Sequence, residues 1–135
     1  LSPQGLRITG LEDSVRYLVS QTNKNSPITY TFQVVDIPDD MSETMTVQLF
    51  RIIQEAIQNI EKHSEADRAD IQLIQHESEL VLTIEDNGKG FPDSDEPNHG
   101  IGIENIKKRV AILGGEVSFF SQPGGGVSIL VGIPN

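Results

Sequence analysis

The spacing of apolar residues along the chain predicts three amphipathic helices. The longest covers about 44–63, and a shorter one covers about 11–24 after a predicted capping box at Thr9–Glu12. A third begins near Ile103, with apolar residues three and four positions apart, and ends at Gly114-Gly115. Helices are therefore expected to be the largest elements of the fold.

Runs rich in β-branched and apolar residues predict five strands between and after these helices. The strands are expected at 28–35, 69–76, 79–86, 116–121 and 127–133. Short turns join the second strand to the third and the fourth to the fifth, which favours antiparallel pairing. The order of elements predicts an α+β fold in a single domain, residues 1–135. It should be a two-layer α/β sandwich with a mixed, mainly antiparallel sheet covered on one face by about three helices.

Composition and charge exclude several classes of function. The chain has 135 residues and no cysteine, so disulfides, thiolate zinc sites and thiol catalysis are ruled out. Its formal net charge of −10 is spread evenly, which argues against a nucleic-acid partner. No apolar run approaches the roughly 20 residues of a membrane-spanning helix, so no direct membrane contact is expected. Because the chain begins with Leu1, we interpret it as a piece of a longer protein.

The long predicted helix carries a polar stripe beside its apolar one. At about 100° per residue, Glu55, Asn59, Lys62 and His63 fall on this stripe, where they would border a cleft. An ordinary solvated face with a cationic last turn explains the stripe better when it is taken alone.

The strand at 79–86 ends in an acid that lies an even number of residues from its apolar ones, so all of them point to the same face of the sheet. Asp86 is therefore expected to point inward with Leu82 and Ile84, where a carboxylate needs hydrogen-bond donors. The amine of a bound base is one candidate donor. Gly88 and Gly90 follow directly and permit close backbone approach by a ligand, although an ordinary Asp-Asn-Gly turn explains the same residues.

A second pair of glycines precedes the third helix. Gly100-Ile101-Gly102 lies where free backbone N–H groups and the helix dipole attract anions. The segment matches neither the P-loop nor the Rossmann fingerprint. Alone, it is typical of an ordinary loop-to-helix junction.

The order of these motifs is more informative than any one of them. Together they resemble the ATP-binding catalytic domain of bacterial sensor histidine kinases, which belong to the GHKL superfamily and have the Bergerat fold. Among these kinases, the resemblance is strongest to the nitrate-sensor-like class. The matching segments are Gln54–His63 (N box), Asp86–Phe91 (G1 box), Gly100–Gly102 (G2 box) and Ser121–Gly126 (the closing glycine box). The resemblance covers essentially the whole chain.

The resemblance implies a catalytic role for the helix at 44–63. Asn59 would hold Mg²⁺, which bridges the phosphates of ATP, and Glu55 would support that metal site. Lys62 and His63 would lie near the phosphates or the ribose.

The glycine-rich segments would bind the rest of the nucleotide. The resemblance implies that Asp86 accepts a hydrogen bond from the adenine amine and that Gly88 and Gly90 shape the pocket. Lys89 would add local positive charge against the repulsion between ATP and an acidic domain. Residues 91–99 would form a lid over ATP, and the backbone of Gly100, Ile101 and Gly102 would cradle phosphates.

The function implied is that of a kinase fragment. The chain would bind Mg·ATP and donate the γ-phosphoryl group to a histidine on a separate dimerisation and phosphoacceptor domain, which would then serve a response regulator. It would be a cytoplasmic domain of a larger sensor kinase, membrane-anchored or not. His63, His76 and His99 match no acceptor-histidine motif. Val127 stands where the family usually has Thr, so a hydroxyl near Asp86 is absent.

Three alternatives remain open from the sequence. A GHKL-type ATP hydrolase would use Glu55 as the general base for water. An anti-sigma serine kinase would phosphorylate a partner protein. A non-catalytic nucleotide-binding interaction module is disfavoured because Asn59 and Asp86 are intact.

Overall fold

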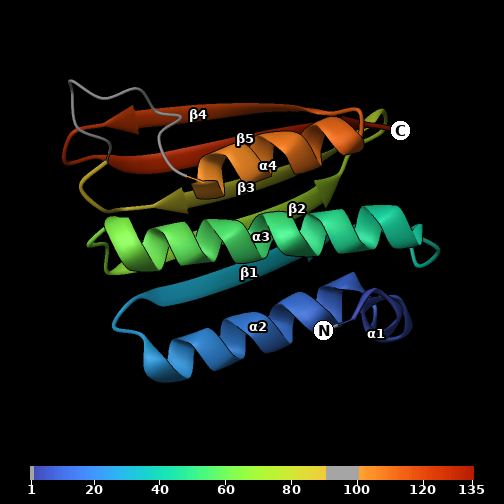
Figure 1. The fold of residues 1–135 in the computed structure, drawn as a ribbon, viewed down its shortest axis with the longest axis horizontal. Helices are drawn as coiled ribbons and strands as arrows, with labels where there is room; N and C mark the ends of the chain where they lie inside the picture. The colour runs from blue at the N-terminus through green and yellow to red at the C-terminus, as the bar shows by residue number, and fades with distance from the viewer. Residues whose placement is uncertain (1, 91–100) are drawn as a thin grey trace.

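The computed structural model describes residues 2–90 and 101–135, and the structural statements below refer to these residues. They form a helical layer on one face of a five-stranded sheet (Figure 1). The elements in chain order are α1 (Pro3–Thr9), α2 (Leu11–Asn25), β1 (Thr29–Val35), α3 (Glu43–His63), β2 (Arg68–Gln75), β3 (Glu79–Asp86), α4 (Ile101–Ile112), β4 (Glu116–Gln122) and β5 (Gly126–Pro134).

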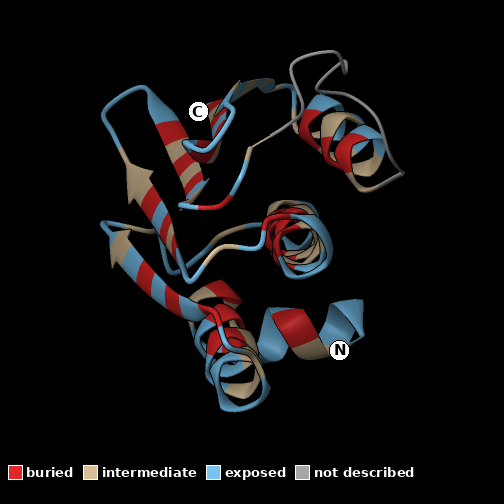
Figure 2. Ribbon diagram, turned by 90° about the vertical axis from the view of Figure 1, so that its left-hand side faces the viewer, coloured by how far each residue is buried: buried red, intermediate tan, exposed pale blue. Residues whose placement is uncertain are grey.

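The sheet is mixed and mainly antiparallel, as the sequence predicts. Its strand order is β1-β2-β3-β5-β4, in which β1 and β2 are parallel and the other three pairs are antiparallel. Viewed from the side, all the helices lie on one face of the sheet (Figure 2). The two-layer α+β sandwich is therefore confirmed.

The core lies between the sheet and the apolar stripe of α3. Leu49, Ile52, Ile53 and Ala56 are fully buried, and buried stripes on the strands face them (Figure 2). Each such leucine or isoleucine contributes about 1.5–3 kcal/mol relative to an exposed position. This packing fixes the rotation of α3, and with it the direction in which the neighbouring polar stripe points.

The N-terminal segment differs from the sequence prediction. Residues 3–9 form an additional helix, α1, and its N-cap Ser2 accepts a hydrogen bond from the Gly5 amide at 3.0 Å. Thr9 ends this helix and does not cap the next one, so the predicted capping box is wrong. The N-cap of α2 is Gly10, which has a φ of 91° and makes no side-chain cap hydrogen bond. Burial of Leu6 holds α1 in place, a tertiary contact that local spacing does not reveal.

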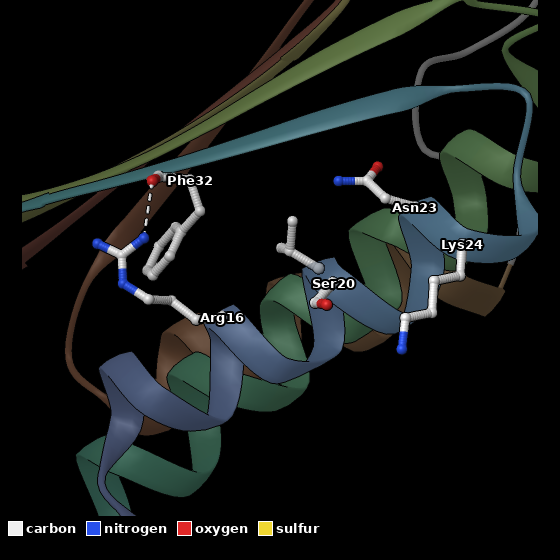
Figure 3. A pocket seen from close by; sticks show the side chains of 6 residues that line it. Arg16, Ser20, Asn23, Lys24 and Phe32 are labelled. Atoms are coloured by element: carbon white, nitrogen blue, oxygen red, sulfur yellow. Dashed lines mark hydrogen bonds between the residues drawn. The ribbon is translucent and has the colours of Figure 1, made fainter.

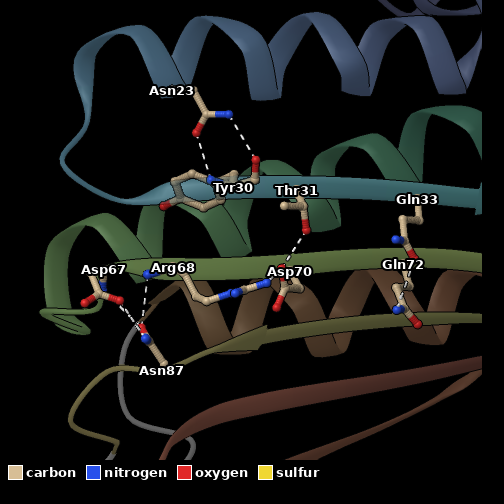
Figure 4. Close-up of polar contacts among 9 residues, drawn as sticks. All are labelled: Asn23, Tyr30, Thr31, Gln33, Asp67, Arg68, Asp70, Gln72 and Asn87. Carbon is tan, nitrogen blue, oxygen red and sulfur yellow. Dashed lines mark hydrogen bonds and ion pairs between the residues drawn. The ribbon is translucent and has the colours of Figure 1, made fainter.

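Strand β1 forms one edge of the sheet, and α2 covers it. The side-chain amide of Asn23 accepts from the Tyr30 amide at 2.8 Å and donates to the Tyr30 carbonyl at 3.0 Å (Figure 4). This pairing replaces the bonds that a further strand would make, so it blocks edge-to-edge association at this point.

Candidate functional site

The segments that carry the predicted site residues meet at one end of the molecule. The C-terminal end of α3, the end of β3, the start of α4 and the β4–β5 turn lie together at the left of Figure 1. The antiparallel course of α3 and α4, and of β3 and β5, brings these four ends together. Motifs spread over some 70 positions of sequence are thus neighbours in space.

Polar contacts join α3 to α4 along the side of α3 that carries the predicted stripe. The Asn105 side-chain amide donates to the Glu55 carboxylate at 3.2 Å. One turn further along α3, Asn59 lies directly against Gly102, because a Cβ atom at Gly102 would overlap the Asn59 amide. Gly102 therefore permits the close approach of the two helices at Asn59.

The side chain of Asn59 is incompletely satisfied. Its Nδ2 atom is buried and finds no hydrogen-bond partner within residues 2–90 and 101–135. A buried amide without a partner costs free energy, so such groups are rare in folded proteins. Mg²⁺ binds oxygen ligands, and the amide oxygen of Asn59 and the carboxylate of Glu55 are both of this kind. The chemistry of Glu55 and Asn59 therefore fits a magnesium site.

Asp86 is half-buried at the end of β3 and faces the helical layer. Its carboxylate accepts a hydrogen bond from the Gly88 amide at 2.8 Å, and the Val127 backbone N–H is a second donor. Burial raises the pKa of Asp86, and these two donors oppose that rise only in part. Val127 therefore contacts Asp86 through its backbone N–H, although its side chain offers no hydroxyl.

The glycines around Asp86 are required by close backbone contacts. A Cβ atom at Gly88 would overlap the carbonyl oxygen of Ser64, and one at Gly90 would overlap that of Gln122. Gly126, with a φ of 82°, lies against the backbone oxygen of Asp86. The loop after β3 is consequently packed between the end of α3 and the β4–β5 turn.

The last turn of α3 is fixed from both sides. The Tyr30 and Ser26 hydroxyls each donate to the Glu61 carboxylate at 2.7 Å. On the other side, the Lys89 amide donates to the Ser64 carbonyl at 2.8 Å. Burial raises the pKa of Tyr30, and the negative charge of Glu61 adds to this rise, so the phenol remains a donor.

Asn87 has a structural role. Its side-chain oxygen accepts from the amides of Asp67 and Arg68, both at 3.0 Å, and its nitrogen donates to the Asp67 carboxylate at 2.6 Å (Figure 4). These bonds tie the loop after β3 to the start of β2. Asn87 therefore holds the adjoining Asp86 in position.

The remaining predicted residues are less constrained. Lys62 and His63 are exposed on the last turn of α3. Lys89 is also exposed, and its ammonium pairs with Glu65 at 3.0 Å. Ile101 is the first residue of α4. The predicted lid at 91–99 and Gly100 lie outside the described residues.

Asn105 contacts a predicted site residue but does not belong to any motif identified from the sequence. The signal lies in its position, three residues after Gly102 on the same side of a helix. Only the antiparallel packing of α3 on α4 shows that this side faces Glu55. Sequence spacing within one helix could not reveal that.

A separate groove lies between α2 and β1, away from the predicted site residues (Figure 3). Its lining residues are Arg16, Val19, Ser20, Asn23, Lys24 and Phe32. The Arg16 guanidinium lies 5.3 Å from the centre of the Phe32 ring and donates to the Phe32 carbonyl at 3.4 Å. These contacts belong to the covering of the β1 edge.

Within the described part of the chain, no helix is long and apolar enough to cross a membrane. The same residues contain no group of three or more histidine or acidic side chains arranged to hold a metal ion. A magnesium ion at Glu55 and Asn59 would therefore take most of its ligands from phosphate and water.

Comparison with known proteins agrees with this geometry. The family of histidine kinase-, DNA gyrase B-, and HSP90-like ATPases matches residues 44–135. The histidine-protein kinase/phosphatase DegS of Brevibacillus brevis is 28% identical over 93% of this chain and 32% of its own length. The sensor protein VraS of Staphylococcus saprophyticus is 32% identical over 99% of this chain and 38% of its own length. The chain thus spans about a third of these relatives.

A solved structure shares the fold. The ATP binding domain of PrrB from Mycobacterium tuberculosis superposes with a TM-score of 0.69 at 20% identity, and the match covers 89% of each chain. The chain therefore belongs to the histidine kinase-, DNA gyrase B- and HSP90-like ATPase family, is an ATP-binding domain of the Bergerat fold, and is homologous to bacterial sensor histidine kinases.

Proposed function

We propose that this domain binds Mg·ATP between α3, the loop after β3 and α4, and donates the γ-phosphoryl group to a histidine on a separate domain. The observation that carries the proposal is that the C-terminal part of α3, the end of β3 and the start of α4 meet at one end of the molecule (Figure 1). These segments carry Asn59, Asp86 and Gly102, respectively, and Gly102 lies against Asn59. The amide of Asn59 beside the Glu55 carboxylate suits a metal ion. The half-buried carboxylate of Asp86 suits a base, and the N-terminus of α4 suits phosphates.

Each group has a distinct part in the proposed binding. Asp86 would accept a hydrogen bond from the adenine amine, in the pocket bounded by Gly88 and Gly90. The backbone at the start of α4, through Gly100, Ile101 and Gly102, would bind phosphate oxygens. Lys62, His63 and Lys89 would add cationic or polar contacts at the rim.

Glu55 and Asn59 would supply the protein ligands of Mg²⁺, directly or through water. When bound, the ion would neutralise negative charge on the phosphates. The fit rests on the oxygen atoms of the two side chains. The unpartnered Nδ2 of Asn59 is a hydrogen-bond donor, so it would bond to a phosphate or water oxygen beside the ion. The domain has a net charge of −10, so neutralisation of the phosphates is a necessary part of ATP binding here.

The proposed transfer is an in-line displacement. An imidazole nitrogen of the acceptor histidine forms a bond to the γ-phosphorus while the bond to the β,γ-bridging oxygen breaks, and its electrons leave with ADP. The imidazole gives up its N–H proton to a base outside this domain. What this chain contributes is positioning and charge stabilisation.

The proposed partners follow from this reaction. The acceptor would be the protein's own dimerisation and phosphoacceptor domain, and a response regulator would receive the phosphoryl group from it. We place the domain in the cytoplasm, where ATP and response regulators are available.

Two measurements test the proposal. Mg·ATP should bind the isolated chain in calorimetry with only negligible release of inorganic phosphate. Mixed with Mg·[γ-³²P]ATP and the acceptor domain, the chain should label a histidine, giving an acid-labile, base-stable phosphate. Steady ATP turnover by the chain alone, lost in Glu55→Gln, would instead identify a hydrolase.

A further inference from the structure

The contact between Glu55 and Asn105 is one of three along a polar seam between α3 and α4. The seam consists of Gln48–Arg109, Glu55–Asn105 and Asn59–Gly102. The partners on α3 are seven and four residues apart, and those on α4 are four and three apart, so one face of each helix supplies them all.

Glu55 needs a fixed donor because its carboxylate is partly buried against α4. A glutamate has three rotatable bonds, and an unconstrained one samples many rotamers. The Asn105 amide, 3.2 Å away, selects one of them. That rotamer keeps the Glu55 carboxylate on the side of α3 where Asn59 lies one turn further on.

We propose that Asn105 is a positioning residue of the nucleotide site, which orients the Glu55 carboxylate for its role in Mg²⁺-dependent ATP binding. The inference rests on the proposed function and deepens it, because it adds a residue from α4 to a metal site built on α3. Residues that orient a metal-supporting carboxylate change metal affinity by about 10–100-fold when they are removed.

The seam supplies a matched control. The Arg109 guanidinium donates to the Gln48 side chain at 3.0 Å, so this contact also joins α3 to α4. It lies seven residues from Glu55, about 10 Å along the helix at 1.5 Å per residue. Gln48→Leu therefore breaks a comparable helix–helix contact without touching Glu55.

The test uses calorimetry of ATP binding by the whole 135-residue chain, with and without Mg²⁺. Asn105→Leu keeps a side chain branched at the same position but removes the donor. It should reduce the gain in ATP affinity that Mg²⁺ provides by about tenfold, the lower end of the range for orienting residues, and leave Mg²⁺-free binding unchanged. Asn105→Gln, which keeps an amide, should restore most of the gain, and Gln48→Leu should retain it.

A double variant tests whether Asn105 acts through Glu55. In the Glu55→Ala background, which removes the acceptor that Asn105 holds, Asn105→Leu should cause no further loss. The inference is overturned if Asn105→Leu matches the wild type, if it lowers Mg²⁺-free binding equally, or if its effect persists in Glu55→Ala. Absence of any ATP binding by the wild type would overturn the proposed function itself, which is a different and recognisable result.

Discussion

The two halves of the candidate site are built differently. Around Asp86, the polar atoms are held by backbone donors, and the glycine loop packs directly on neighbouring carbonyl groups. Around Asn59, side chains from two helices meet, and the buried Nδ2 atom has no partner in the described part of the chain. Under the proposed function, the pocket for the base would therefore be largely preformed, whereas the metal side would be completed when Mg·ATP binds.

Removing the Asn59 amide should have the largest effect, because the metal side depends on few protein ligands. Asn59→Ala should reduce Mg²⁺-dependent ATP binding by more than about a hundredfold, since even residues that only orient a ligand change metal affinity by about 10–100-fold. Stability should change little, because the amide nitrogen makes no hydrogen bond to the described residues. Calorimetry and thermal melting measure both quantities.

The neighbouring Gln58 is the control for this experiment. It is exposed on α3, so Gln58→Ala should leave both affinity and melting temperature unchanged. Unaltered Mg·ATP affinity in Asn59→Ala would show that the metal does not depend on this amide.

Around Asp86, a substitution should lower both stability and ATP binding, because it disturbs the packing of the loop after β3. Gly88→Ala places a methyl group against the Ser64 carbonyl, so the loop that carries Asp86 must shift. We expect a loss of about 1–3 kcal/mol in the free energy of unfolding, together with weaker ATP binding with or without Mg²⁺. Gly125→Ala is much less crowded, because its Cβ would lie 3.2 Å from the Gln122 Cβ and 3.4 Å from the Gln122 carbonyl oxygen, so the change should stay within about 0.5 kcal/mol. Equal stabilities of the two variants in urea titrations would contradict the close-packed loop.

The smallest expected effect concerns the pH dependence of stability. Burial raises the pKa of Asp86, so the folded chain binds this proton more tightly than the unfolded chain. The resulting stabilisation is fully present below the unfolded pKa and is lost as pH rises through the folded pKa. Asp86→Asn should therefore melt at the same or a slightly higher temperature than the wild type at pH 7, and this advantage should shrink on acidification. A marked loss of stability at pH 7 would identify the carboxylate as structural.

Much of the fold was predictable because it depends on local pattern. The apolar stripe of α3 and the alternation in β3 each specify an element and its buried face, and the observed bounds differ from the predicted ones by at most a few residues. Helix α1 was missed because only Leu6 within it is buried, which leaves almost no periodic signal.

The site was predictable only in part. Asp86 and Asn59 could be singled out because they belong to motifs that are contiguous in sequence, and their roles stay predictions. Asn105 and the Val127 backbone donor were missed because their roles depend on which faces of α4 and β5 pack against α3 and β3. Such information is tertiary, so it does not exist in the spacing of residues along one element.

The most direct test of the account compares ATP and GTP binding by the wild type and Asp86→Asn. If Asp86 recognises the adenine amine, guanine places a carbonyl acceptor against it, leaving two facing acceptors at a cost of roughly 1–3 kcal/mol. The wild type should then prefer ATP by at least about tenfold, and Asp86→Asn should shrink or invert that preference while its melting temperature is maintained. A variant that binds both nucleotides more weakly, with their ratio unchanged and its melting temperature lowered, would contradict the account.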